Sequence, residues 1–212
     1  RVKEVLLDRQ QNLSMYGVCA ADDGRIAVLA TSLGGWGRDF TAGDTGVWLL
    51  GAGAPQRLGD GAEDPVPTLS GPLAAVGDAF HLLGGERGRT QLIRIDRTGA
   101  RTVLAGGDRV VTGHAAAAER VLITSLTPDS AGRVELLAEG GIVELADASA
   151  PLRASGLVTP RELEITGREG YPVHGWLAVP SGPGPPPPLL LLHGGPHSPY
   201  DVGVFEIGRA PA

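Results

Sequence analysis

The 212-residue chain has few of the residues that mark secreted, membrane-spanning or nucleic-acid-binding proteins. Cys19 is the only cysteine, so an intrachain disulfide is excluded and a reducing compartment is expected. Lys3 is the only lysine, no basic cluster occurs, and the formal net charge is −6. These features argue against nucleic acid or an anionic membrane as a partner. Apolar runs are far shorter than the roughly 20 residues that span a bilayer. We therefore expect a cytoplasmic protein.

Helical periodicity is also lacking over residues 1–150, where short strand-like runs alternate with turns. The 33 glycines and 17 prolines stand mainly between these apolar runs, as turn residues do. This pattern predicts a mainly β fold. The predicted strands are 15–21, 26–31, 47–50, 79–83, 91–95, 102–105, 121–125, 134–138 and 142–145.

A similar turn recurs three times and predicts how these strands are organised. It occurs at residues 21–24, 75–78 and 118–119, and each copy opens a hairpin. The copies are about 54 and then about 41 residues apart, which brackets the roughly 40 to 50 residues of a four-stranded propeller blade. We therefore predict a partial β-propeller of about three blades. An open meander or a sandwich with coincidentally similar turns is the alternative.

The character of the chain changes near Ala150-Pro151. Two alternating segments, 162–165 and 173–179, flank a glycine-bounded turn and predict a β-hairpin. The proline-rich stretch 181–188 can be neither a helix nor a central strand, because proline lacks the N–H and fixes φ. Four leucines follow at 189–192 and predict a strand buried on both faces of a parallel sheet.

The leucines lead directly into the tetrapeptide His193-Gly194-Gly195-Pro196. A glycine-rich turn after a buried strand is typical of the oxyanion hole of α/β-hydrolases, where backbone N–H groups stabilise the tetrahedral intermediate. The sequence therefore predicts part of an active site at this turn. We assign residues 1–155 to the partial propeller and 156–212 to the first strands of an α/β-hydrolase domain.

From about residue 160 to 205 the chain resembles the prolyl oligopeptidase family of serine peptidases. The resemblance rests on Gly175-Trp176-Leu177 in the hairpin, the proline-rich connection and the His193–Pro196 turn, and it is closest to the acylaminoacyl-peptidase and dipeptidyl-aminopeptidase branches. In that family a propeller precedes the hydrolase domain. The resemblance implies that the Gly195 N–H is an oxyanion donor and that Gly194 permits the turn. It also implies short or N-terminally blocked peptides as substrates and no cofactor.

The nucleophile that the resemblance requires is missing from this sequence. The family places its serine on a Gly-x-Ser-x-Gly elbow, followed along the chain by an aspartate and a histidine. No serine here has glycine two residues before and two residues after it. Beyond Phe205 the chain also departs from the family, whose members would continue into a long helix. We therefore expect a truncated peptidase fragment that is inactive alone.

Several other interpretations of the polar residues are weaker. Ser198 stands beside His197, but a loop serine next to a histidine lacks the oriented base that activates a nucleophile. His193 and His197 have the spacing of helical metal ligands, yet the intervening glycines and proline disfavour a helix. No metal site is therefore predicted. His81 and His114 alternate with apolar neighbours and are interpreted as packed residues.

A second hypothesis concerns the function as a whole. The chain could act as a non-catalytic, propeller-like binding or interaction module in which the hydrolase portion is a remnant. Its open sheet edges and its leucine-rich segment would then need a partner to cover them. An elbow serine in the flanking coding sequence would favour the peptidase, whereas a stable solitary fold would favour the binding module.

Overall fold

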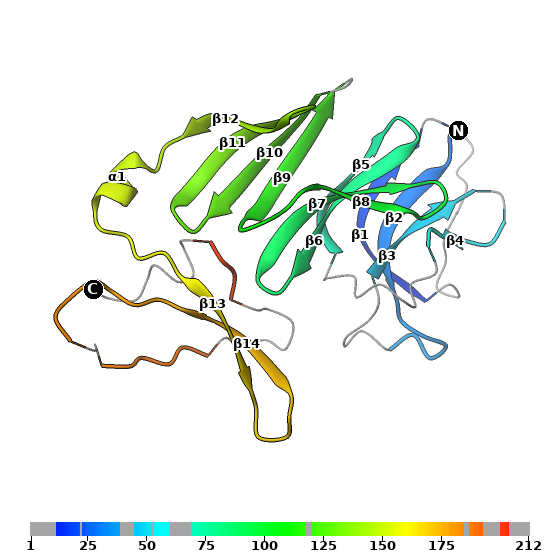
Figure 1. Cartoon of the computed structure of the whole chain (residues 1–212). Coiled ribbons are helices and arrows are strands. Elements are labelled where there is room, and N and C mark those ends of the chain that lie inside the picture. Colours follow the sequence, from blue (N-terminus) through cyan, green and yellow to red (C-terminus); the bar gives the residue numbers. More distant parts are fainter. Residues whose placement is uncertain are drawn as a thin grey trace.

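The computed structural model describes residues 12–21, 23–38, 45–51, 53–59, 69–117, 120–184, 187–192 and 200–203. More than half of these residues are in strands and only one short helix is present among them, as the predicted mainly β class requires (Figure 1). The elements are β1 (Leu13–Ala20), β2 (Ile26–Ser32), β3 (Thr45–Leu50), β4 (Gln56–Arg57), β5 (Leu69–Val76), β6 (Ala79–Glu86), β7 (Arg89–Asp96), β8 (Arg101–Ala105), β9 (Val110–Ala117), β10 (Arg120–Thr127), β11 (Ser130–Ala138), β12 (Gly141–Asp147), α1 (Ala150–Ala154), β13 (Arg161–Thr166) and β14 (Pro172–Leu177).

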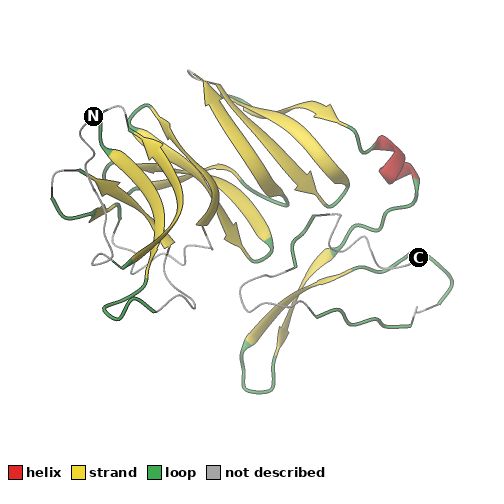
Figure 2. Ribbon diagram, turned by 180° about the vertical axis from the view of Figure 1, so that it is seen from behind, coloured by secondary structure: helices red, strands yellow, loops and turns green. Residues whose placement is uncertain are grey.

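The first twelve strands form three antiparallel meanders of four strands each: β1–β4, β5–β8 and β9–β12. The second and third meanders join in one sheet through a single parallel pair, Thr90 of β7 with Val110 of β9. The first strands of the meanders, β1, β5 and β9, contact one another in that order (Figures 1 and 2). The meanders are three blades of a β-propeller, as predicted.

The recurring turn lies at the same place in each blade, between its first and second strands. It stands between β1 and β2, between β5 and β6 and between β9 and β10, although residue 22 of the first copy and both residues of the third copy, 118–119, lie outside the described residues. Three strands were not predicted: β4, which is two residues long, and the blade-opening strands β5 and β9. Gly71 and Pro72 interrupt the strand pattern of β5, and three consecutive alanines weaken that of β9.

Two apolar clusters hold the blades together, and β6 contributes to both. Phe80 and Leu82 face the first cluster, which includes Leu29 of β2 and Leu49 of β3. Leu83 faces the second cluster with residues of blade three, Val111 and Ile123 among them. Successive side chains of a strand point to opposite faces, so β6 packs against both neighbouring blades at once. Cys19 packs against the first cluster as a small apolar residue.

A buried ion pair stabilises blade three. Glu135 of β11 is only 3% exposed. Its Oε2 accepts a hydrogen bond from Arg109 Nη1 at 2.8 Å and another from Ser125 Oγ at 2.6 Å. Arg109 Nε also donates to the carbonyl oxygen of Gly106 at 2.8 Å. The carboxylate and the guanidinium therefore satisfy each other, and removing one would leave an uncompensated buried group.

The part of the chain after residue 155 begins with a hairpin, as predicted. Strands β13 and β14 pair antiparallel in a two-stranded sheet of their own, with Glu162 opposite Trp176. Within the part of the chain that the structure describes, no helix is long and apolar enough to cross a bilayer.

The predicted buried strand at 189–192 was wrong. These four leucines have no strand conformation and are between 47% and 80% exposed. The described residues place no strand beside them, so their backbone groups have no ladder partners and their side chains have no apolar cover. A run of leucines forms a buried strand only where neighbouring strands of a sheet pair with it.

We expect the Glu135→Ala substitution to lower the free energy of unfolding by roughly 1–3 kcal/mol, because it leaves the half-buried Arg109 and the buried Ser125 hydroxyl without their shared acceptor. Urea denaturation followed by circular dichroism measures the change. Asp78→Ala is the control: it removes the partner of Arg94 from an aspartate that is 81% exposed, and should cost less than about 1 kcal/mol. An equal loss from both substitutions would contradict the prediction, and the double variant Arg109→Met/Glu135→Leu should recover most of the loss.

Candidate functional site

The predicted oxyanion turn, His193–Pro196, lies outside the described residues, as do His197 and Ser198. The residues on either side of it are described. The hydroxyl of Tyr200 donates a hydrogen bond to the carbonyl oxygen of Leu192 at 3.4 Å, so the side chain that follows residues 193–199 contacts the residue that precedes them. The Val202 N–H then donates to the carbonyl oxygen of Gly88 at 2.8 Å, and Val202 is only 1% exposed. The chain after the turn thus returns to the propeller.

The contact on the propeller is the tight turn between β6 and β7. Arg87 and Gly88 have φ values of 49° and 72°, and Glu86 pairs with Arg89. Two consecutive positive φ values are typical of the two-residue hairpin turn whose twist suits the flanking strands. A Cβ added to Gly88 would lie 2.5 Å from the Tyr200 carbonyl oxygen and 2.9 Å from Trp176 Nε1. Only glycine therefore fits both the backbone conformation and the available space.

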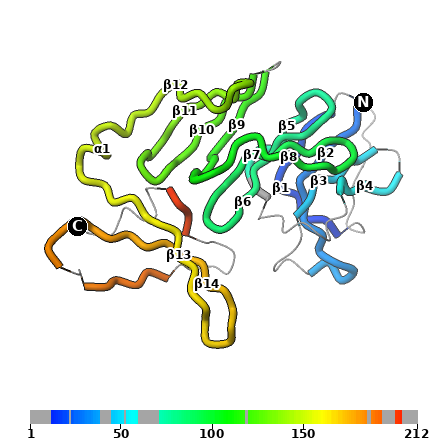
Figure 3. The backbone as a smooth tube through the Cα atoms, viewed as in Figure 1, coloured from blue at the N-terminus to red at the C-terminus, as the bar shows by residue number. Residues whose placement is uncertain are grey.

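Trp176 of β14 lies between this turn and the segment that follows the oxyanion turn. Its Nε1–H donates a hydrogen bond to the Tyr200 carbonyl oxygen at 3.2 Å. The guanidinium carbon of Arg89 stands over the indole ring, 4.9 Å from the centroid. The His174 ring meets the same indole edge-on at 5.2 Å. One aromatic side chain of the hairpin thus contacts both the propeller and residue 200. In the backbone trace of Figure 3 the β13–β14 hairpin lies below the lower ends of β6 and β7.

Charged groups surround this contact. Arg89 Nη2 pairs with Asp108 at 2.8 Å and with Glu162 at 3.0 Å. Arg87 pairs with Glu164 and lies 3.6 Å from Glu162. The Nε2 atom of His174 lies 2.9 Å from Glu162 Oε1. We call Gly88, Arg89, Glu162, Trp176 and Tyr200 the junction cluster.

Hydrogen bonding shifts the pKa values of two members of the junction cluster, Glu162 and Arg89. The hydrogen bond from Arg89 is the main cause that lowers the pKa of Glu162, and it outweighs burial, which acts in the opposite direction. Burial alone would lower the pKa of Arg89, but its hydrogen bonds to Glu162 and Asp108 outweigh burial and raise that pKa. Both groups therefore stay charged at neutral pH. Because these ion pairs are partly exposed, they contribute little to the free energy of unfolding and act mainly by orienting the side chains.

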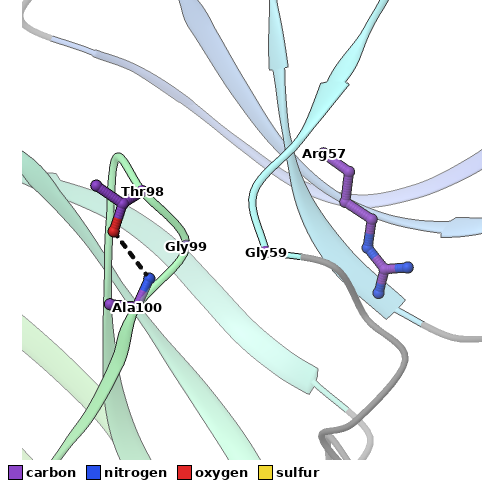
Figure 4. A pocket seen from close by; sticks show the side chains of 5 residues that line it. All are labelled: Arg57, Gly59, Thr98, Gly99 and Ala100. Atoms are coloured by element: carbon purple, nitrogen blue, oxygen red, sulfur yellow. Dashed lines mark hydrogen bonds between the residues drawn. The ribbon is translucent and has the colours of Figure 1, made fainter.

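The junction cluster holds no nucleophile with an adjacent base, so it can position groups but not carry out hydrolysis. Elsewhere, a shallow depression is lined by Arg57, Gly59 and residues 98–100 (Figure 4). The Thr98 hydroxyl donates to Asp96 at 2.6 Å there, which stabilises the β7–β8 turn. Among the described residues no group of three or more histidine, cysteine, aspartate or glutamate side chains could hold a metal ion.

His81 and His114 are packed residues, as their sequence context indicates. His81 of β6 is 4% exposed, and its ring centroid lies 6.3 Å from that of His114 in blade three. Burial, the nearby His114 and Arg94 together lower the pKa of His81 to about 4. Burial also lowers the pKa of His114. Both imidazoles are therefore neutral at neutral pH.

Neither a protein-family model nor a curated protein matches the chain. Solved structures do. The acylaminoacyl peptidase of Pyrococcus horikoshii aligns with a TM-score of 0.61 and 16% identity, over 80% of this chain and 25% of that one. A puromycin-hydrolysing peptidase of Mycobacterium tuberculosis aligns with a TM-score of 0.54 and 21% identity, over 79% of this chain and 26% of that one. The chain has the fold of part of these peptidases.

A third structure of this fold is an acylaminoacyl peptidase in complex with Z-Gly-Gly-Phe-chloromethyl ketone, with a TM-score of 0.61 and 17% identity. It is covered over 25% of its length, so this chain spans about a quarter of the peptidases that it matches. The shared fold agrees with the resemblance to the prolyl oligopeptidase family, which rests on the hairpin and on the His193–Pro196 motif.

Protonation of His81 should make the stability of the fold depend on pH. In the unfolded chain this imidazole takes up a proton near pH 6.5, but in the folded chain only near pH 4. The unfolded state therefore binds more protons between these values, and the free energy of unfolding should fall by up to about 3 kcal/mol from pH 6.5 to pH 4. Denaturant titrations at several pH values test this, with His81→Leu as the comparison. Parallel pH curves for the two proteins would contradict the prediction.

Proposed function

We propose that this chain is part of a serine peptidase that hydrolyses short or N-terminally blocked peptides. Its residues 1–155 would form propeller blades that limit access to small substrates, and residues 156–212 would begin the α/β-hydrolase domain. The proposal rests on the junction between the two parts of the chain. In the segment that follows the His193–Pro196 motif, the Val202 N–H donates to Gly88 of the propeller and the Tyr200 carbonyl accepts from Trp176 of the hairpin. The peptidase folds that the chain matches support it.

The proposed mechanism gives this chain one part of acyl transfer. The Gly195 N–H would donate to the carbonyl oxygen of the scissile bond as negative charge develops there, and Gly194 would allow the turn without a side-chain clash. The second donor would come from a longer protein that includes these 212 residues. The same longer protein would supply the catalytic serine, histidine and aspartate. A donor stabilises an oxyanion only after a nucleophile has formed it, so the 212 residues alone should not hydrolyse peptides.

The first test is to extend the chain through its flanking coding sequence and search all reading frames for a Gly-x-Ser-x-Gly elbow followed by aspartate and histidine. The extended protein should react with a fluorophosphonate probe and hydrolyse acetyl-alanine p-nitroanilide, whereas the 212-residue chain should do neither. Absence of the elbow, or an extended protein without hydrolase activity, would contradict the proposal.

In the extended enzyme, Gly195→Pro should lower kcat by about 10²- to 10³-fold with KM little changed, because proline lacks the donating N–H. Gly195→Ala is the matched control, since it adds a side chain at the same position but keeps the N–H. Steady-state kinetics on both variants measure the difference. Equal kcat values for the proline and alanine variants would show that this N–H is not an oxyanion donor.

A non-catalytic binding module is the second candidate, and the exposure of the leucines at 189–192 favours it. Four adjacent exposed leucines would be covered either by further strands of a hydrolase sheet or by another protein. The same extension experiment separates the two functions: without an elbow serine, the binding role would stand in place of the peptidase.

A further inference from the structure

The β13–β14 hairpin contacts the propeller through side chains. Among the described residues it forms a two-stranded sheet of its own and shares no backbone ladder with a blade. Every residue of its two strands is exposed or only partly buried. An isolated two-stranded hairpin is at best marginally stable in water. The position of this hairpin therefore depends on the groups that it directs at the propeller.

The facing surfaces carry opposite charges. Arg87 and Arg89 lie at the β6–β7 turn, while two glutamates, Glu162 and Glu164, stand two residues apart on β13 and so point to the same face. Arg87 pairs with Glu164, and Arg89 Nη2 lies 3.0 Å from Glu162 Oε2. The side chains of the two glutamates are 38% and 54% exposed. Dissolved salt can therefore screen both pairs, because the Debye length falls from about 10 Å at 0.1 M to about 3 Å at 1 M.

Arg89 has a second carboxylate partner that belongs to the propeller. Asp108, between β8 and β9, accepts a hydrogen bond from Arg89 Nε at 3.0 Å and another from Nη2 at 2.8 Å. When the hairpin leaves, Arg89 loses Glu162 but keeps Asp108. In the docked state, moreover, the two carboxylates share one guanidinium and repel each other. Asp108 thus favours release of the hairpin, whereas Glu162 opposes it.

We propose that these two arginines and two glutamates form a salt-sensitive latch, from which the hairpin detaches while the propeller stays folded. The stacking of Arg89 over Trp176 belongs to the same latch, because the indole moves with β14 and the guanidinium with blade two. The apolar clusters that hold the blades together are not weakened by salt. The junction is therefore the place where the two parts of the chain separate first. This inference does not depend on whether a longer protein hydrolyses peptides.

The indole N–H of Trp176 reports on the latch. It donates to the Tyr200 carbonyl at 3.2 Å, while the Val202 N–H bonds that segment to the propeller. Detachment of the hairpin therefore exposes the indole N–H to water. Its NMR signal is one of three indole signals and is identified with Trp176→Phe. From about 0.05 M to about 1 M NaCl its exchange with solvent should become about three- to tenfold faster, while the Leu92 amide in blade two keeps its rate. Indole exchange that salt does not change, or equal acceleration of both groups, would overturn the proposal.

The sharpest test is a matched pair of variants, Glu162→Gln and Asp108→Asn. Each removes one negative charge next to Arg89 and keeps the size of the side chain, so the change in net charge is the same. Glu162→Gln should make the indole exchange about three- to fivefold faster, and Asp108→Asn should make it about twofold slower. A general effect of net charge would move both rates in one direction. Exchange in Asp108→Asn that equals or exceeds that of the unsubstituted chain would contradict the latch.

A swap of charges tests the pairing itself. Arg87→Glu alone should make the indole exchange about three- to fivefold faster, because it sets like charges against each other. Adding Glu164→Arg should restore about half of the lost protection or more, since the pair forms again with opposite polarity. Asp78→Asn, which breaks the exposed pair with Arg94 elsewhere in blade two, is the control and should leave the indole rate unchanged. The Leu92 amide shows that each variant remains folded. Without recovery in the double variant the proposal would be wrong.

Discussion

The fold depends on one strand that is covered on both faces. Residues 79–84 of β6 are buried without interruption, with Phe80 and Leu82 facing blade one and Leu83 facing blade three. Because blade two shares an apolar cluster with each neighbour, the three meanders pack against one another. Burial on both faces also removes the alternation of polar and apolar residues that a half-exposed strand shows.

The same strand connects packing to the junction. At its far end β6 turns through Arg87 and Gly88 into β7, and this turn is where the hairpin and the Tyr200–Gly203 segment meet the propeller. Close packing on both faces restricts the movement of β6. The turn that follows it therefore holds Gly88 and Arg89 in a defined position. The ionic pairs around Arg89 are partly exposed and add orientation more than stability.

Much of the propeller could be predicted from local patterns, whereas the junction could not. The recurring turn and nine strand-like runs identified the three blades, because each blade repeats the same local unit. Strands β5 and β9 were missed, since Gly71, Pro72 and the alanines of β9 obscure the strand pattern. The leucine run was misjudged because its burial depends on neighbouring strands that the described residues do not include. Gly88 gave a local signal, a glycine after Arg87 between two strands, but its contacts with Trp176 and Tyr200 join positions more than eighty residues apart.

The link between blades two and three has a consequence for how the chain folds. Among the described residues one parallel bridge pair, Thr90 with Val110, joins their ladders, and the strands paired within each of these blades are antiparallel and consecutive in the sequence. Each blade can therefore close its own hairpins from a contiguous stretch of chain as that stretch leaves the ribosome, before the next blade has been synthesised. Short-range pairing of this kind lowers contact order, so a fold made almost entirely of strands can form by adding one repeat after another.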